Sequence, residues 1–502
     1  MTMKTAKLFY TSHPVVILLF GLIIAQVIGA LQVYLSNLDL YNTLANVSSA
    51  GYLAIPNKNV MGRLQEIGPA FWGGLFFTFT VGAGVSLGAM ASAWIWVRMF
   101  LGKKTNLAFF LILWAGVMIL VNSNGFVLMP TLYFLIIAPV VFSLTAARES
   151  IIETPSNRLK RLIHFIPVPL LALLWFTQFD NQMFLDLRDN LLLSNNYGRK
   201  FSHFYYTYTL YPAEAFKALN QKTIKTARVK NVEDSSTDQR IGKLLTAYDY
   251  LPLSDATDVD LIIHQKMGHL IFQSDNHPVF QIPTNQFLAD PREALQKFSA
   301  ACDRYAVFRQ ITFLSLLIGF PVSIYMILHA VFYYLGYFII GRSTSALTAS
   351  IICLLIGIMV LVSFQLNRSR NIQIPNIADA LSSADWQTRV AALKLIAQKK
   401  LEIASFGTYP DLIKNETPQE RYWLVRALAV SRRPDTFGDL LEFLNDDNLN
   451  VRTMAFYSLG LRKDPRAIGP ILSKVKKSDN WYDQMYAYKA LRSLGWKQTR
   501  SP

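Results

Sequence analysis

The chain of 502 residues has few charged side chains and almost no cysteine. Asp, Glu, Lys and Arg together make up 16% of it, whereas about 25% is usual in soluble domains. An ordinary soluble protein is therefore excluded. The two cysteines, Cys302 and Cys353, are too few for a disulfide framework, and the sequence has no paired Cys-x-x-Cys for a metal or for covalently attached haem.

The sequence also lacks several motifs that carry chemistry. It has no Gly-rich phosphate loop and no His-Glu-x-x-His zinc motif. The long apolar stretches contain almost no acidic or basic side chains, although ion-coupled transporters usually carry such charges inside the membrane. These absences favour a protein that is neither an enzyme nor an ion-coupled transporter.

Long apolar stretches are abundant, because 52% of the residues are hydrophobic. A helix needs about 20 apolar residues to cross the hydrocarbon core, where its backbone groups must bond to each other. The sequence therefore predicts a polytopic membrane bundle of seven helices. Five spans belong to a membrane region over residues 1–179 and two to residues 310–367. The predicted spans are residues 14–35, 70–97, 105–122, 126–147, 162–178, 310–341 and 343–367.

Basic residues beside the spans predict the orientation. With the N-terminus in the cytoplasm, nine Lys and Arg residues flank the first five spans inside, and only Lys58 and Arg63 lie outside. Since Lys and Arg are enriched in cytoplasmic flanks, we expect a multi-pass protein of a bacterial cytoplasmic (inner) membrane. Residues 180–309 and the C-terminal region would then be periplasmic, although Arg368 and Arg370 favour the opposite side for the latter.

The second span is rich in small residues. Gly84, Gly88 and Ser92 recur every four residues, which allows another helix backbone to approach closely. We expect these residues to pack within the bundle. A dimer contact or a moving helix is the alternative.

Residues 180–309 have the composition of a small α+β domain. The stretch 203–211 is β-prone by content. Residues 260–264 and 269–272 predict a hairpin around a Gly-containing turn, with a further strand at 279–282. Asp290 and Pro291 are typical of a helix start, and we expect that helix to continue into the sixth span without a break.

The C-terminal region contains an internal repeat. Segments that begin at Arg389, Arg421, Arg452 and Gln484 align at steps of 32, 31 and 32 residues, with the first, fourth and eighth positions of each on one helical face. In the middle units a second helix begins at Pro434 or Pro465.

The segment Val451-Arg452-x-x-Ala455-x-x-x-Leu459, followed by Asp464-Pro465-Arg466-Ala467, resembles HEAT-type repeats of the short, lyase-like variety. The resemblance covers about residues 380–497 and implies an α-solenoid over 368–502 that binds other proteins. Surfaces near Arg389, Arg421, Arg452 and Arg466 would carry that contact. Alternatively, the solenoid only packs on the middle domain or on the membrane. The complete predicted fold class is mainly α: a seven-helix membrane bundle, an inserted α+β domain and a HEAT-like solenoid.

Two histidines lie in predicted spans. His164 is near the start of the fifth and His329 near the end of the sixth, and His13 would lie at the same depth. Two facing imidazoles can hold the iron of a b-type haem, but histidines at helix ends more often act as packing residues.

The resulting functional hypothesis is a membrane scaffold or assembly protein that binds partner proteins, within a membrane complex, through its repeats. Its partners would be proteins and the lipid bilayer, not nucleic acid. One alternative is the membrane subunit of an electron-transfer complex with haem at His164 and His329. Another is a permease or lipid-handling protein in which the Gly-rich second span moves.

Overall fold

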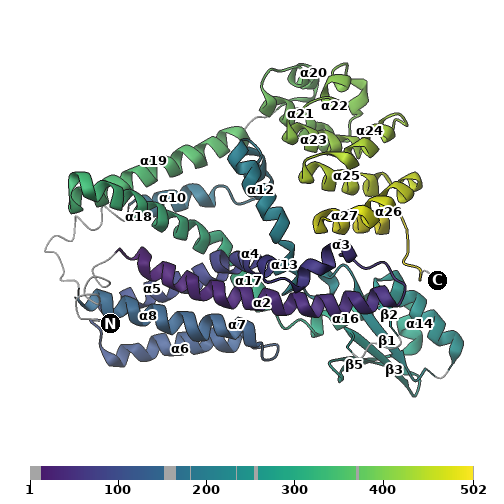
Figure 1. Cartoon of the computed structure of the whole chain (residues 1–502), viewed down its shortest axis with the longest axis horizontal. Helices are drawn as coiled ribbons and strands as arrows, with labels where there is room; N and C mark the ends of the chain where they lie inside the picture. The colour runs from purple at the N-terminus through teal and green to yellow at the C-terminus, as the bar shows by residue number, and fades with distance from the viewer. Residues whose placement is uncertain are drawn as a thin grey trace.

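The computed structural model describes residues 13–151, 166–180, 182–232, 234–253, 258–368 and 372–500. The described residues are mainly helical. Long helices run side by side, and a sheet-containing domain and a stack of short helices both lie beyond the same end of them (Figure 1). The mainly helical fold class, with a small sheet, is thus confirmed.

Within the described residues, six helical segments are long and apolar enough to cross a membrane. Their bounds are α2 (Val15–Ser49), α4–η2–α5 (Ile67–Phe77, Thr78–Gly82 and Ala83–Arg98), α6 (Lys104–Val121), α7–η3–α8 (Leu128–Leu132, Tyr133–Ile137 and Ala138–Ile151), α17–η6–α18 (Ala306–Leu314, Ser315–Gly319 and Phe320–Ile340) and α19 (Arg342–Arg368). The segments η2, η3 and η6 are π-helical turns within these helices.

The predicted fifth span is the one that differs. Its described part is α10 (Pro167–Phe176), ten residues long, and residues 162–165 lie outside the described residues. Ten helical residues extend only about 15 Å, half of the hydrocarbon thickness. The seven-helix bundle therefore stays a prediction.

Helix α2 is longer than a membrane requires. Its 35 residues extend about 52 Å, whereas the hydrocarbon core is about 30 Å thick. Its last turns, with Leu44 and Val47 fully buried, continue beyond the other long helices. The loop that follows, with α3 (Lys58–Met61) and η1 (Gly62–Gln65), is thereby placed among the globular parts.

Small residues of the second long segment pack within the chain. A Cβ atom on Gly84 would lie 2.7 Å from Cβ of Ser315, and one on Gly319 would lie 3.0 Å from the backbone of Gly84. Only glycine permits this approach between α5 and the η6 turn. The predicted intramolecular packing is thus observed at Gly84.

The middle domain contains a five-stranded sheet with strand order β2-β1-β3-β4-β5. The strands are β1 (Lys225–Lys230), β2 (Tyr250–Pro252), β3 (Leu261–Lys266), β4 (His269–Ser274) and β5 (His277–Pro283). β1 is parallel to β2 and β3, and the predicted β3–β4 hairpin is antiparallel. Its turn, Met267-Gly268, has positive φ at both residues, as a type I′ turn requires. The accompanying helices are α14 (Ser235–Ala247), α15 (Thr284–Ala289) and α16 (Pro291–Ala301).

Two predictions in this region are wrong. The β-prone stretch 203–211 is helical and belongs to α12 (Asn196–Tyr208) and α13 (Leu210–Glu214). The side chain of Asn195 caps α12 by accepting the N–H of Gly198 at 2.8 Å. Helix α16 begins at Pro291 as predicted, but it ends at Ala301 and does not continue into the sixth span. In the turn that follows it, the carboxylate of Asp303 accepts the N–H of Tyr305.

The C-terminal region, residues 372–500, is a stack of helix pairs that we call the repeat domain. After η7 (Ile374–Asn376) and α20 (Ile377–Leu381), the first helices of the repeats are α21 (Trp386–Lys399), α23 (Pro418–Leu428), α25 (Leu449–Arg462) and α27 (Trp481–Ser493). The second helices are α22 (Tyr409–Ile413), α24 (Thr436–Glu442) and α26 (Ile468–Lys477), and short 3-10 turns lie at Ile403–Ser405, Phe443–Asn445 and Pro465–Ala467. The first helices lie toward α12, and the second helices lie on the far side (Figure 1).

Candidate functional site: the inner face of the repeat domain

Three of the four predicted partner-binding arginines connect neighbouring repeats. Each forms an ion pair with an acid near the start of the next repeat. The pairs are Arg389 with Glu420, Arg421 with Asp446 and Arg452 with Asp483. Burial raises the pKa of Asp483 although Arg452 opposes that shift. We call these three pairs the arginine ladder. They give the arginines an internal role, and their contact with partner proteins stays a prediction.

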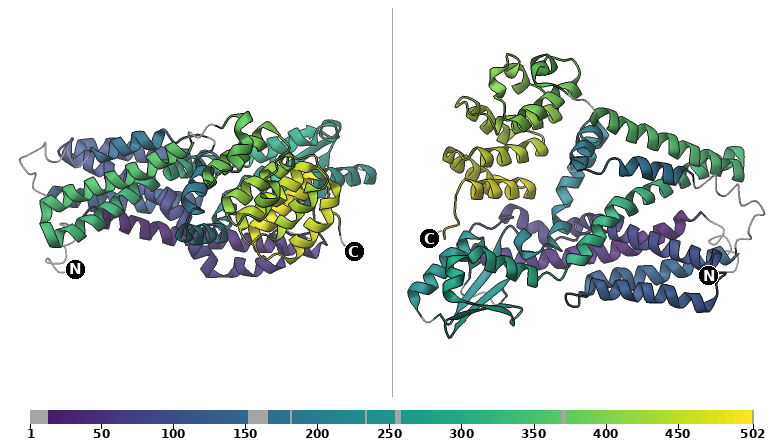
Figure 2. Two further views of the ribbon diagram at one scale, coloured as in Figure 1. Left: turned by 90° about the horizontal axis from the view of Figure 1, so that it is seen from above. Right: turned by 180° about the vertical axis from the view of Figure 1, so that it is seen from behind.

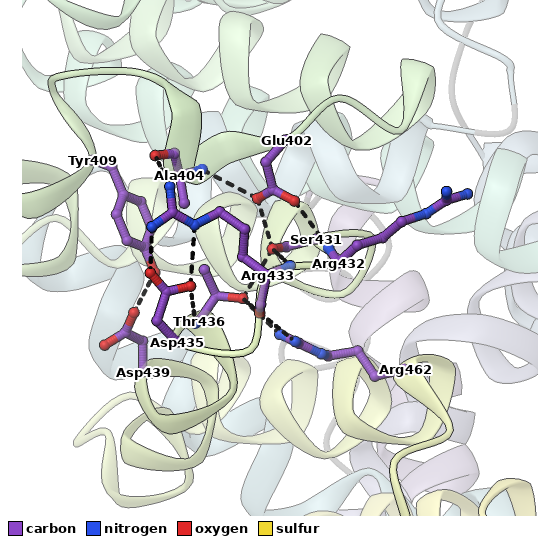
Figure 3. A network of polar contacts seen from close by, with 10 residues as sticks. All are labelled: Glu402, Ala404, Tyr409, Ser431, Arg432, Arg433, Asp435, Thr436, Asp439 and Arg462. Carbon is purple, nitrogen blue, oxygen red and sulfur yellow. Dashed lines mark hydrogen bonds and ion pairs between the residues drawn. The ribbon is translucent and has the colours of Figure 1, made fainter.

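A second network joins three repeats at the opposite edge of the stack (Figure 3). The carboxylate of Glu402 accepts hydrogen bonds from Ser431 Oγ at 2.7 Å and from the N–H of Arg432 at 2.9 Å. Ser431 Oγ lies 2.9 Å from Thr436 Oγ1, which also accepts from Arg462 at 2.9 Å. Burial would raise the pKa of Glu402, but these hydrogen bonds lower it. The arginine ladder and the Glu402 network thus connect neighbouring repeats at two edges of the stack.

The inner face of the stack, formed by the first helices, is covered by the chain's own residues. α11 (Met183–Leu187) and the π-helical turn η4 (Arg188–Leu192) lie against it. The carboxylate of Asp189, only 1% exposed, accepts the indole N–H of Trp423 at 2.8 Å. Its backbone oxygen accepts Nε2 of Gln419 at 3.2 Å. A buried carboxylate of η4 is therefore bound by α23.

Cations complete this contact. The guanidinium of Arg188 donates to Asp189 at 2.6 Å and lies 3.6 Å from the ring centroid of Tyr422. Burial alone would lower the pKa of Arg188, but Asp189 and Tyr422 outweigh it, and the pKa is raised. Lys394 donates to Asp186 at 3.2 Å and lies 4.8 Å from the ring centroid of Trp423. Aromatic rings and charges from both sides thus pair across the inner face.

The last repeat binds the loop that follows α2. Asn57 and Gln484 form two amide hydrogen bonds, because the N–H of Asn57 donates to Gln484 Oε1 at 2.8 Å and Gln484 Nε2 donates to Asn57 Oδ1 at 2.9 Å. Gln498 bonds both backbone groups of Leu53, at 3.1 and 2.8 Å. Such paired amide contacts satisfy groups that burial would otherwise leave unbonded.

The same repeat binds the middle domain. Asp249, at a positive φ of 63°, accepts a hydrogen bond from Tyr488 at 2.6 Å and pairs with Arg492 at 2.9 Å. Arg492 also donates to the backbone oxygen of Ala247 at 2.6 Å. The repeat domain is thus attached to α11–η4, to the loop after α2 and to the middle domain.

Comparison with known families agrees with this geometry. A protein-family model described as HEAT repeats matches residues 409–492, which contain the helices from α22 to α27. Residues 409–492 are HEAT repeats. No curated protein and no solved structure matches the chain, so the comparison characterises only the last part of it.

Sequence reasoning found the HEAT repeats but not what covers them. The acids and the arginine at positions 186–189 occur in an ordinary polar segment, and nothing in their spacing points to Trp423, 234 residues later. The contacts of Asp249 show that the HEAT repeats pack on the middle domain. That they only pack there, without binding partners, stays an alternative. Arg466 is the one of the four arginines with a mostly exposed side chain, 63%.

The predicted haem ligands are only partly within the described structure. His164 lies outside the described residues. His329 lies 3.1 Å, nitrogen to nitrogen, from His13, and its other nitrogen lies 3.2 Å from Ser350 Oγ. This direct hydrogen bond leaves no room for an iron atom between His13 and His329. Haem held by His164 and His329 stays a prediction.

The second long segment contains a five-residue pattern that resembles the nucleophile motif of hydrolases. Gly84-Val85-Ser86-Leu87-Gly88 matches the Gly-x-Ser-x-Gly elbow of hydrolases, which requires a strand-to-helix turn with an exposed serine. Here Ser86 is inside α5 and fully buried, so the elbow geometry is absent. Over the described residues, no group of three or more His, Cys, Asp or Glu side chains is arranged to hold a metal ion.

Proposed function

We propose that this chain is an integral membrane scaffold that docks partner proteins on its HEAT repeats. HEAT repeats generally form extended surfaces for other proteins, and the match at residues 409–492 supports such a role. Six long apolar helices support insertion into a membrane. The single observation that carries the proposal is that the HEAT repeats, with an exposed edge, are attached at the ends of these helices.

The orientation follows from combining contacts with charge. The HEAT repeats touch the middle domain through Asp249, so both belong on one side of the bilayer. The end of α5 and the start of α6, which carry Arg98, Lys103 and Lys104, lie at the opposite end of the helices (Figure 1). Since basic flanks favour the cytoplasm, we propose seven crossings, a cytoplasmic N-terminus and two periplasmic domains of a bacterial inner membrane protein.

The inner face is already occupied, so a partner needs another surface. We propose the edge formed by the loops between the paired helices, which we call the basic edge. Arg432 and Arg466 are exposed on it, and the guanidinium of Arg466 lies 4.4 Å from the ring centroid of Phe437. The acids Asp435 and Asp464 of these loops are held by Arg433 and Arg466. The basic edge consists of Lys399, Lys400, Arg432, Arg433, Arg462, Lys463 and Arg466.

An excess of exposed cations favours a partner with an acidic segment. We expect a photo-reactive residue placed at Arg432 of the full chain, in native membranes, to crosslink a discrete protein. The charge reversal Lys463→Glu should abolish that product. Lys414, an exposed lysine at the other edge of the stack, provides the control position. Crosslinks of equal yield from Lys414, or none from Arg432, would reject the basic edge as the docking surface.

A further inference from the structure

Helix α12 presents a different environment on each of its sides. Residues four apart lie on the same side of a helix, so their contacts show what each side of α12 packs against. Phe204 and Tyr208 lie 5.6 and 6.3 Å, ring to ring, from Trp72 of α4. Tyr206 lies 5.0 Å from the ring of Tyr482 in the HEAT domain. α12 is therefore held between the apolar helices and the HEAT repeats.

The side of α12 that carries Phe204 and Tyr208 also carries exposed aromatic residues. Tyr197, Phe201 and Tyr205 follow at intervals of four residues and are 86%, 57% and 40% exposed. We call these three residues the aromatic row. Exposed aromatic residues in a regular row mark an interaction surface rather than a chance distribution.

The aromatic row lies beside apolar surface that belongs to the long helices. It lies on the side of α12 that contacts Trp72, and Trp72 and Phe71 of α4 are themselves exposed, as is Ile67 at the start of that helix. Both views place α12 across the ends of the long helices, next to the HEAT domain (Figures 1 and 2). The row thus continues the surface by which the long helices would meet lipid.

The side of α12 opposite the aromatic row is polar. Arg199 and His203, also four residues apart, are exposed, and so is Lys200. A helix with aromatic residues on one side and cations on another fits the boundary between the acyl chains and the headgroups, where aromatic rings and Lys or Arg side chains concentrate.

We propose that α12 is an interfacial helix whose aromatic row is immersed in the headgroup–acyl boundary of the leaflet that faces the two globular domains. The inference rests on the proposed membrane insertion. Because Tyr206 and Thr209 of the same region contact Tyr482, the latter by a 2.8 Å hydrogen bond, the lipid surface also fixes the height of the HEAT repeats above the membrane.

Spin labels at single cysteines test this. The full chain with Cys302→Ser and Cys353→Ala is reconstituted in vesicles of phosphatidylcholine and phosphatidylglycerol. Labels are placed at Phe201→Cys, at Arg199→Cys as the matched control on the same helix, and at Ile112→Cys on α6, whose side chain is exposed. The ratio of oxygen to nickel-chelate accessibility should be several-fold higher at position 201 than at position 199.

The outcomes separate the two proposals. A low ratio at position 112 would overturn membrane insertion itself. A high ratio at position 112 with equal ratios at positions 199 and 201 would overturn only the interfacial placement of α12. Low access of both reagents at position 201 would mean that protein covers the row, which also contradicts the proposal. Tyr197→Cys gives a second site on the row if Phe201→Cys does not fold.

Discussion

At the scale of single residues, the carboxylate of Asp189 joins parts of the chain that are 234 positions apart. It accepts hydrogen bonds from Trp423 and Arg188, and all three groups are buried. A buried charge in such a cluster is stable only while each partner is present. The attachment of η4 to the HEAT repeats should therefore be sensitive to a single substitution here.

We expect Asp189→Asn to weaken this attachment by about 3–5 kcal/mol, because it leaves the cation of Arg188 buried without a counter-charge. The melting midpoint of the full chain in detergent should fall, and amide exchange in α23 should rise. Asp411→Asn, at an exposed carboxylate of α22, is the control and should change neither. An unchanged exchange rate in α23 for Asp189→Asn would contradict the assigned role.

A ladder arginine, Arg421, can be compared with Arg466, which lies outside the ladder. Arg421 bonds Asp446, Asp447 and the backbone oxygen of Glu416. Arg421→Ala therefore removes the counter-charge of the Asp446 carboxylate, which is 6% exposed, and should cost about 1–3 kcal/mol of stability. Arg466→Ala, at an exposed pair that solvent screens, should lower the stability much less. Thermal unfolding of both variants measures this, and equal effects would be inconsistent with the ladder.

At the scale of elements, the sequence pattern predicted the repeat helices, whose positions follow from local spacing. It did not predict the helix at residues 203–211, which packs on a distant part of the chain. The repeat of 31 to 32 residues located α21, α23, α25 and α27, since each must present an apolar side to its neighbours. The aromatic content of residues 203–211 predicted a strand. Phe204 and Tyr208, which contact Trp72, are four residues apart, and this spacing brings them to one side of a helix. The exposed aromatic row belongs to the same helix.

Residues 162–178 show another limit of sequence reasoning. Their apolar composition predicted a span, but composition does not place helix ends, and the described helix begins only at Pro167. The predicted continuity of α16 into α17 was wrong for a similar reason, because a turn at residues 302–305 separates the two helices. Element types were thus easier to predict than boundaries.

An ion pair joins the start of β3 to the segment before β1 in the middle domain. Asp260, just before β3, pairs with Lys222 at 2.7 Å and accepts the N–H of Thr226 in β1 at 2.8 Å. Burial would raise the pKa of Asp260, but Lys222 and Thr226 lower it below the ordinary 3.8. Its stabilising contribution is therefore complete above about pH 4 and is lost as the pH falls through the lowered pKa.

We expect exchange of the β1 and β3 amides, corrected for the intrinsic effect of pH, to accelerate below about pH 4 in the natural chain. In Asp260→Asn, exchange should be faster at neutral pH and should change less on acidification. The exposed Asp238→Asn in α14 is the control. Identical pH dependence in the natural chain and Asp260→Asn would show that another group governs acid sensitivity.

At the scale of the whole molecule, three attachments place the HEAT repeats beside the middle domain and against α12. The sequence contains both domains as separate segments, and each attachment joins positions more than 200 residues apart. No local pattern encodes such contacts, so the proposed side of the HEAT repeats rested on a span count. The contacts of Asp249 with Tyr488 and Arg492 connect the middle domain directly to the HEAT repeats. Their placement on one side of the membrane therefore no longer depends on the number of spans.

The most direct test labels both domains from one side of the membrane. Single cysteines at His277 in the middle domain and at Arg466 in the HEAT repeats, both exposed, are placed in the Cys302→Ser, Cys353→Ala chain. Intact spheroplasts are then treated with a membrane-impermeant maleimide, before and after permeabilisation. We expect both cysteines to react fully without permeabilisation. Reaction of one cysteine before permeabilisation and of the other only afterwards would contradict the docking of the two domains on one face of the membrane.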